Sequence, residues 1–276
     1  MLPTLTAATL DPGALTEWDA YVQSATARMN ERAKPGASYL WADESPERLA
    51  RVRAGEIVVA PRAPQIPIKV PSGLIHDWIG ATFIPQVSLH QVLQVVRDYS
   101  EYKELYEPDV IESRTIQSGD LASGAATDRF SMLLIHKAVS LKTAIDADYE
   151  SRFTRLDDRR VYSIGHTTRI QEMADYGSSA EHLLPEGTGH GLIWRLFTIT
   201  RYLERDGGVY IEFEAIALSR DIPASIRWLV EPVVRRLSRT SLSASLRETG
   251  KAVLRRVELA KRSDPAQESS AFSYKP

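Results

Sequence analysis

Cysteine is absent from the 276 residues of this chain. Disulfides, thiolate-bound zinc, iron–sulfur clusters and a cysteine nucleophile are therefore excluded. The charge balance also lacks a dominant sign, because 34 Lys and Arg residues stand against 36 Asp and Glu residues. A net charge of −2 provides no general attraction for nucleic acid or for an anionic membrane. Neither is expected as a partner.

Long apolar runs are missing as well. No stretch approaches the roughly 18 to 20 residues that a membrane-spanning helix needs, so no integral membrane segment is expected. Residues 1–10 have neither the basic start nor the apolar core of a signal peptide. The expected location is the cytoplasm, or the periplasm or the medium if a signal peptide was removed before residue 1.

Motifs that carry chemistry are scarce in this chain. The sequence contains no G-x-S-x-G, Walker or paired-carboxylate pattern, and no histidine has the partner spacing of a local zinc motif. We therefore expect no catalytic residue, no cofactor and no metal site. His136 and His166 lie on predicted strands and face a cavity in one interpretation, whereas ordinary surface or core positions are the alternative.

The first part of the chain has a helical pattern. Asp11 is a suitable N-cap and Pro12 suits the first turn of a helix over 11–33. A shorter helix is predicted from Ser45 to Gly55, and 56–60 suits a short strand. Four prolines within 61–71 exclude a central strand there. Residues 1–71 are thus expected to form a helical extension and a linker, packed on the main domain because they are too few for a core of their own.

Residues 72–260 have the pattern of a sheet between helices. A strand over 73–84 is followed by a short helix over 88–97 and a tyrosine-rich turn that ends at Pro108. Six further strands are predicted, at 109–118, 125–139, 141–156, 160–174, 191–204 and 208–219. A long amphipathic helix over 222–257 completes the domain, and the polar tail over 261–276 is expected to be disordered.

Two of these strands alternate clearly between apolar and charged residues. In 141–156, Ile145, Ala147, Tyr149, Ser151 and Phe153 share one face. In 208–219, the apolar residues Val209, Ile211, Phe213 and Ala215 oppose Glu212 and Glu214. Such strands predict a sheet with one wet face and one apolar face, which needs a cover.

The final helix supplies that cover. Its apolar stripe starts at Ile226 and continues through Leu237, Leu242, Leu246, Val253 and Leu254. Pro232 and the segment 238–241 are expected to kink or break it.

Short motifs connect this order of elements to a known family. They are Val95-Val96-Arg97-Asp98-Tyr99-Ser100-Glu101-Tyr102 with Pro108-Asp109-Val110, then Trp194-Arg195-Leu196 and 204–209. Over about 72–258 the chain resembles the START-like superfamily, especially its bacterial members. That superfamily includes lipid-transfer domains, relatives of the birch pollen allergen, polyketide cyclases and coenzyme-Q-binding proteins. The resemblance implies an α+β helix-grip fold, in which a curved antiparallel sheet of about seven strands wraps around a long C-terminal helix.

The predicted function is binding or carriage of a hydrophobic small molecule, such as a lipid, an isoprenoid or a polyketide, in an internal cavity. One alternative is a cyclase or aromatase that uses the same cavity. Another is an interaction module whose N-terminal helices plug the cavity. The superfamily holds both carriers and enzymes, so activity stays open. The candidate ligand-binding residues, each with core packing as its alternative role, are Trp78, Tyr99, Tyr102, Tyr149, Phe153, His166, Trp194, Phe213 and Leu246.

Overall fold

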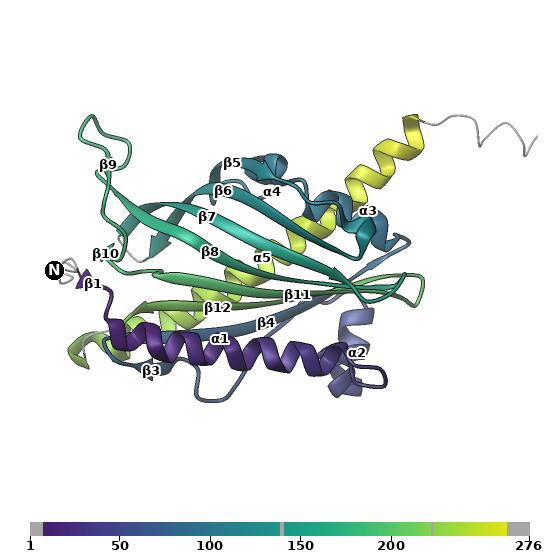
Figure 1. Ribbon diagram of the computed structural model, residues 1–276, viewed down its shortest axis with the longest axis horizontal. Coiled ribbons are helices and arrows are strands. Elements are labelled where there is room, and N and C mark those ends of the chain that lie inside the picture. The colour runs from purple at the N-terminus through teal and green to yellow at the C-terminus, as the bar shows by residue number, and fades with distance from the viewer. Residues whose placement is uncertain (1–7, 139–140, 222–223, 264–276) are drawn as a thin grey trace, which may run out of the picture.

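The computed structural model describes residues 8–138, 141–221 and 224–263, without the side chains of 136–143, 224–235, 237 and 263. One large antiparallel sheet dominates the described chain (Figure 1). Its strands follow the order β2-β4-β12-β11-β8-β7-β6-β5. The long strands are β4 (Gly73–Pro85), β5 (Val110–Gln117), β6 (Ala125–Ala138), β7 (Leu141–Arg155), β8 (Arg160–Ala174), β11 (Arg195–Arg205) and β12 (Gly208–Arg220).

These long strands are the ones that the sequence predicts, and their order around the long final helix is that of a helix-grip fold. The sheet has ten strands rather than about seven, because β2 (Val58–Pro61) and β3 (Ile68–Val70) pair with β4 and β9 (His182–Leu183) pairs with β8. Each addition is too short to show alternation in the sequence. The proline-rich segment supplies edge strands only, as its prolines require. A separate two-stranded sheet joins β1 (Ala8–Thr9) to β10 (Thr188–Gly189).

Local sequence signals begin the helices. The Asp11 side chain accepts a hydrogen bond from Gly13 N at 2.7 Å and caps α1 (Pro12–Ala33). Ser88 and Gln91 form a capping box at the start of α3 (Leu89–Val96). The two remaining short helices are α2 (Pro46–Arg53) and α4 (Tyr102–Leu105).

The C-terminal helix α5 (Ala224–Ser263) is continuous, so the break expected at Pro232 and 238–241 is wrong. Tertiary packing overrides the local preference, because α5 lies against α3, β4, β2 and β12. Leu242, Leu246 and Val253 of the predicted stripe are buried, whereas Leu254 is exposed. The side chains of the stripe from Ile226 to Leu237 and the tail over 264–276 lie outside the described residues.

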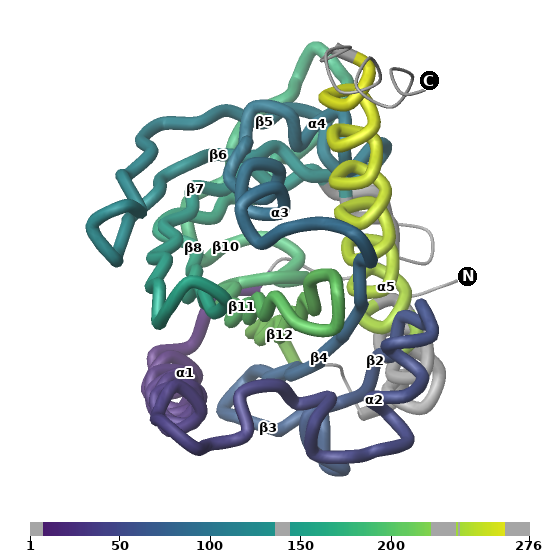
Figure 2. Tube along the Cα trace, turned by 90° about the vertical axis from the view of Figure 1, so that its right-hand side faces the viewer, coloured from purple at the N-terminus to yellow at the C-terminus, as the bar shows by residue number. Residues whose placement is uncertain are grey.

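The sheet has helices on both faces (Figure 2). We call the face covered by α5 and α3 the inner face, and the opposite face, which α1 covers, the outer face. Trp18, Ala25 and Met29 of α1 form a core with Ile79 and Ile216 of the sheet. The extension therefore adds a layer outside the sheet. The expectation that its helices plug the cavity is wrong for the described chain.

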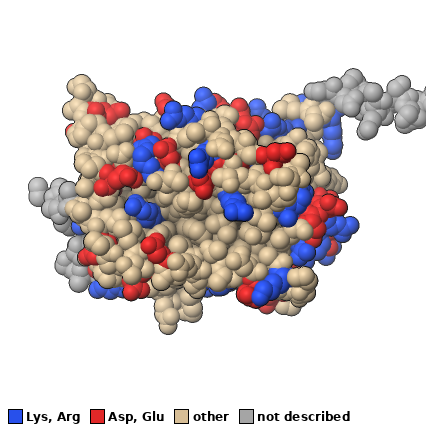
Figure 3. Space-filling model, in the orientation of Figure 1, with Lys and Arg blue, Asp and Glu red and all other residues tan. Residues whose placement is uncertain are grey.

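The outer face of β12 corrects a second expectation. Glu212 and Glu214, predicted to face water, are buried under α1 and the segment that follows it. The outer face of β5 to β8 carries exposed charges, among them Glu112 and Arg114. Partly exposed Arg169 pairs there with Asp146 and Asp148 at 3.1 and 2.8 Å. Side chains of both signs alternate on the surface in this orientation (Figure 3). The solvent-exposed part of the outer face is thus confined to one half of the sheet.

Candidate functional site

An aromatic cluster fills one end of the inner face. The segment Asp98-Tyr99-Ser100 ends α3, as its sequence predicts, and turns Tyr99 toward the sheet. The Tyr99 ring stacks on Phe130 of β6 with centroids 3.9 Å apart, and Phe130 stacks on Tyr149 of β7 at 4.9 Å. Tyr102 of α4 meets Tyr99 and Phe130 edge-on. Such contacts stabilise aromatic pairs beyond their burial.

A buried ion pair holds this cluster in place. Asp128 of β6 is fully buried and accepts two hydrogen bonds from Arg97, at 2.8 and 2.7 Å. The same carboxylate accepts from the Tyr99 hydroxyl at 3.0 Å and from Gly119 N at 2.9 Å. Hydrogen bonding to Asp128 raises the pKa of Arg97 above its usual value. With its oxygens engaged, Asp128 positions the end of α3 and is not free to exchange protons with a ligand.

The inner tyrosines are hydrogen-bond donors rather than bases. Burial raises the pKa of Tyr99, Tyr102, Tyr149 and Tyr202 above the ordinary tyrosine value. The Tyr102 hydroxyl donates to Val96 O at 2.6 Å. The Tyr149 hydroxyl has no hydrogen-bond partner among the residues that the structure describes. It is therefore available to a ligand.

The middle of the inner face is less buried than the outer face behind it. In the middle of β11 and β12, six inner side chains are partly exposed: Leu196, Thr198, Thr200, Phe213, Ala215 and Ala217. Toward the hairpin turn, the inner side chains of Tyr202, Val209 and Ile211 are buried. The outer side chains that alternate with them are buried: Phe197, Ile199, Arg201, Glu212, Glu214, Ile216 and Leu218. α1 seals the outer face, whereas α5 leaves space over β11 and β12.

A small hollow lies on this inner face, beside the aromatic cluster. Its volume is about 40 Å³, and Phe130, Tyr149, Ser151, Gly165, Leu196 and Thr198 are among the residues that line it. The glycine is needed here, because a Cβ on Gly165 would come within 2.7 Å of Thr198 Oγ1. The hollow is large enough for a water molecule.

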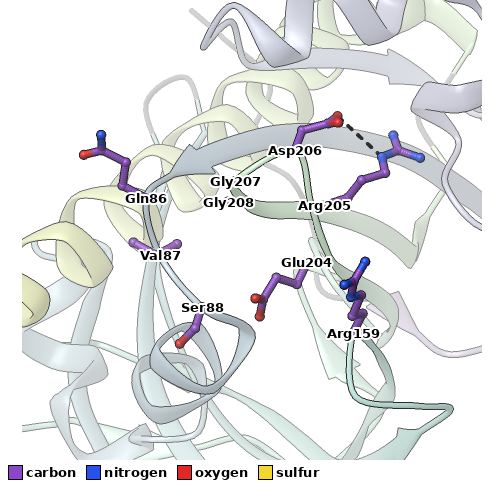
Figure 4. Close-up of a pocket in the computed structure, with 9 residues that line it drawn as sticks. All are labelled: Gln86, Val87, Ser88, Arg159, Glu204, Arg205, Asp206, Gly207 and Gly208. Carbon is purple, nitrogen blue, oxygen red and sulfur yellow. Dashed lines mark ion pairs between the residues drawn. The ribbon is translucent and has the colours of Figure 1, made fainter.

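A larger pocket, of about 410 Å³, opens at the turn between β11 and β12 (Figure 4). Asp206 and Gly207 both have positive φ there, as expected for an Asp-Gly hairpin turn. The Glu204 carboxylate accepts from Leu89 N at 2.6 Å, and Arg205 pairs with Asp43 at 2.7 Å. This pocket is polar and open to solvent, so it does not suit an apolar ligand.

The structure separates the nine predicted ligand-binding residues into two groups. Those on the inner side are Trp78, Tyr99, Tyr102, Tyr149, Phe153, Phe213 and Leu246. His166 is exposed and lies opposite Glu150 in the strand register, on the outer face, but both residues also border the small hollow beside Gly165. Trp194 lies in the core formed with α1. The inner face therefore brings seven of the nine to one side. The His136 side chain lies outside the described residues.

Several inner-face residues were not predicted, among them Asp128, Phe130 and Thr198. Strands 125–139, 160–174 and 191–204 carry apolar residues on both faces, so their inward side is ambiguous in the sequence. The ambiguity has a physical cause, since α1 gives β11 and β12 an apolar environment on the outer face too.

Within the described residues, no group of three or more His, Asp or Glu side chains is arranged to hold a metal ion. Among the helices that the structure describes, none is both long enough and apolar enough to span a membrane.

No family model and no curated protein sequence matches this chain. Solved structures with a similar fold include a STAR-related lipid transfer protein from Xanthomonas axonopodis, with a TM-score of 0.43 and 15% identity over 71% of this chain and 98% of that one. Human STARD10 has a TM-score of 0.43 and 12% identity, covering 79% of this chain and 83% of its own. The Zhui aromatase/cyclase from Streptomyces sp. R1128 has a TM-score of 0.38 and 13% identity, covering 65% of this chain and 96% of its own.

The fold is assigned by strand order, since β4, β12, β11, β8, β7, β6 and β5 lie side by side in the described sheet and α5 crosses it. By this topology the described chain has a helix-grip fold.

Proposed function

We propose that this protein binds and carries a hydrophobic small molecule between the inner face of its sheet and α5. The observation that carries the proposal is the unequal burial of β11 and β12. The six inner side chains from Leu196 to Thr200 and from Phe213 to Ala217 stay partly exposed beneath a long helix, whereas the outer side chains that alternate with them are buried. A protein that needed the sheet only as a core would gain stability by covering both faces equally.

The chemistry of the inner face suits an apolar ligand. Phe213, Ala215, Ala217 and Leu196 offer apolar surface, and each square ångström removed from water contributes about 25 cal/mol to binding. The Tyr149 hydroxyl supplies a polar contact that can set orientation. Carriage is favoured over catalysis because Asp128 and Tyr99, which face each other inside, are bonded to protein groups.

Native mass spectrometry of the purified protein and titration with the apolar fluorophore N-phenylnaphthylamine test this proposal. We expect a co-purifying ligand or saturable probe binding. Ala215→Phe, which fills the inner face of β12, should weaken probe binding by about tenfold, the effect of about 1.4 kcal/mol of steric cost. Arg152→Phe, at an exposed position on the outer face of β7, is the matched control and should leave binding unchanged. An Ala215→Phe variant that binds the probe as wild type does would refute the site, and no binding by wild type would refute the function.

A further inference from the structure

A row of small side chains crosses the inner face at right angles to the strands. In the register of the sheet, Trp78 lies opposite Ala215, Ala215 opposite Thr198, Thr198 opposite Gly165 and Gly165 opposite Ser151. Neighbours in such a row have Cβ atoms about 5 Å apart. One large residue, Trp78, therefore stands at the β4 end of a floor that four small residues form.

The residues two positions along each strand differ in size. On one side they are Phe213, Thr200, Ser163 and Phe153, and on the other they are Ala217, Leu196, Thr167 and Tyr149. Four strand spacings separate Trp78 from Ser151, which makes the floor about 19 Å long. The 40 Å³ hollow lies over Thr198, Gly165 and Ser151. We call this floor of small side chains the trough.

The Trp78 indole marks one end of the trough. The residue is only 8% exposed, and its Nε1 is fully buried with no hydrogen-bond partner among the described side chains. A buried donor left without a partner costs about 1–3 kcal/mol. An oxygen atom of a ligand would remove that cost, because indole N–H only donates.

The surroundings of Trp78 determine the charge of that ligand atom. Trp78 belongs to an apolar cluster with Ile66 and Leu242, and Phe213 and Ala215 pack against it. A carboxylate placed against these apolar side chains would be costly to bury, whereas a neutral carbonyl or ether oxygen would cost much less.

We infer that the ligand is an elongated neutral apolar molecule, which lies across the strands from Trp78 to Ser151 and accepts a hydrogen bond from Trp78 Nε1 through a terminal oxygen. This inference rests on the proposed function and adds the ligand's class, direction and polar end. At the far end of the row Asp128 follows Ser151, and its saturated ion pair closes the trough.

Three probes of equal length test the polar end: a long-chain methyl ketone, the matching alkane and the matching fatty acid. Displacement of N-phenylnaphthylamine measures each affinity. Trp78→Phe keeps the apolar ring and removes the N–H, so we expect a roughly 3- to 10-fold loss for the ketone and no change for the alkane. Trp194→Phe in the outer core should change neither. The acid should bind wild type more weakly than the ketone.

A second variant tests the direction. Ser151→Leu fills the far end of the trough, so it should weaken a ketone that spans about 19 Å and spare one of half that length. Each comparison is made between two ligands on one variant, so a general loss of folding cannot imitate the result. Equal effects of Trp78→Phe on ketone and alkane, or of Ser151→Leu on both lengths, would overturn the inference while leaving apolar binding intact. Wild type that binds none of the probes would instead refute the proposed function.

Discussion

Replacing Arg201 with methionine is expected to lower the free energy of unfolding by about 3–5 kcal/mol. Arg201 is 1% exposed on β11, and its Nε donates to Glu212 at 2.8 Å. Its Nη1 lies 3.6 Å from Glu214, whose carboxylate is also buried. Methionine fills most of the space but leaves these carboxylates without their central cation. The loss is the cost of uncompensated buried charge.

Urea unfolding measures this loss, with Arg129→Met as the matched control. Arg129 pairs with Glu150 at 2.9 Å on the outer face, but its side chain is 55% exposed. Removing an exposed pair should cost no more than about 1 kcal/mol. If the two variants unfold at the same urea concentration, the ion pairs of Arg201 with Glu212 and Glu214 do not stabilise the fold.

As the pH rises from about 4 to about 7, we expect Asp77 to lower the stability of the folded protein. Burial and the nearby Glu214 raise the pKa of Asp77 to about 7, against the opposing effects of Tyr21, Arg28 and Arg62. The folded protein therefore keeps a proton that the unfolded chain releases near pH 4. Across this window the folded state loses about 4 kcal/mol relative to the unfolded chain, and above pH 7 the loss is complete.

Asp77→Asn removes the titration while keeping an acceptor for the Tyr21 hydroxyl, which donates to Asp77 Oδ2 at 2.8 Å in the wild type. Urea unfolding at pH 4 and pH 8 should show the variant close to wild type at the lower pH and more stable at the higher. The gain at pH 8 is on the order of 1–3 kcal/mol, because the contact of Arg28 with the carboxylate is lost at the same time. An unchanged pH dependence in Asp77→Asn would show that another group controls it.

The sequence predicts the fold wherever a local pattern decides it. Asp11 and Pro12 locate the start of α1, and the alternation in 141–156 gives β7 its correct inner face. The alternation in 208–219 wrongly predicts that Glu212 and Glu214 face water. Their partner Arg201 and the amides of Trp41 and Ala42 come from segments that no local pattern connects to β12. Ala42 and Glu212 are 170 positions apart in the chain, so no local periodic pattern can predict their contact.

The candidate site is predictable only in its aromatic half. Tyr99, Tyr102 and Tyr149 stand out in the sequence by type and position. The small residues Ala215, Thr198, Gly165 and Ser151 have no such signal, because each is unremarkable on its own strand. Only the register across four strands puts them in a row, and that register depends on tertiary structure.

A crystal structure with a long-chain methyl ketone that carries bromine at its far end tests the central claim most directly. The account predicts the ketone oxygen within hydrogen-bond distance of Trp78 Nε1, and the anomalous bromine signal over Ser151 on the inner face. A bromine signal in the polar pocket beside Glu204 and Arg205, or no signal between the sheet and α5, would contradict it.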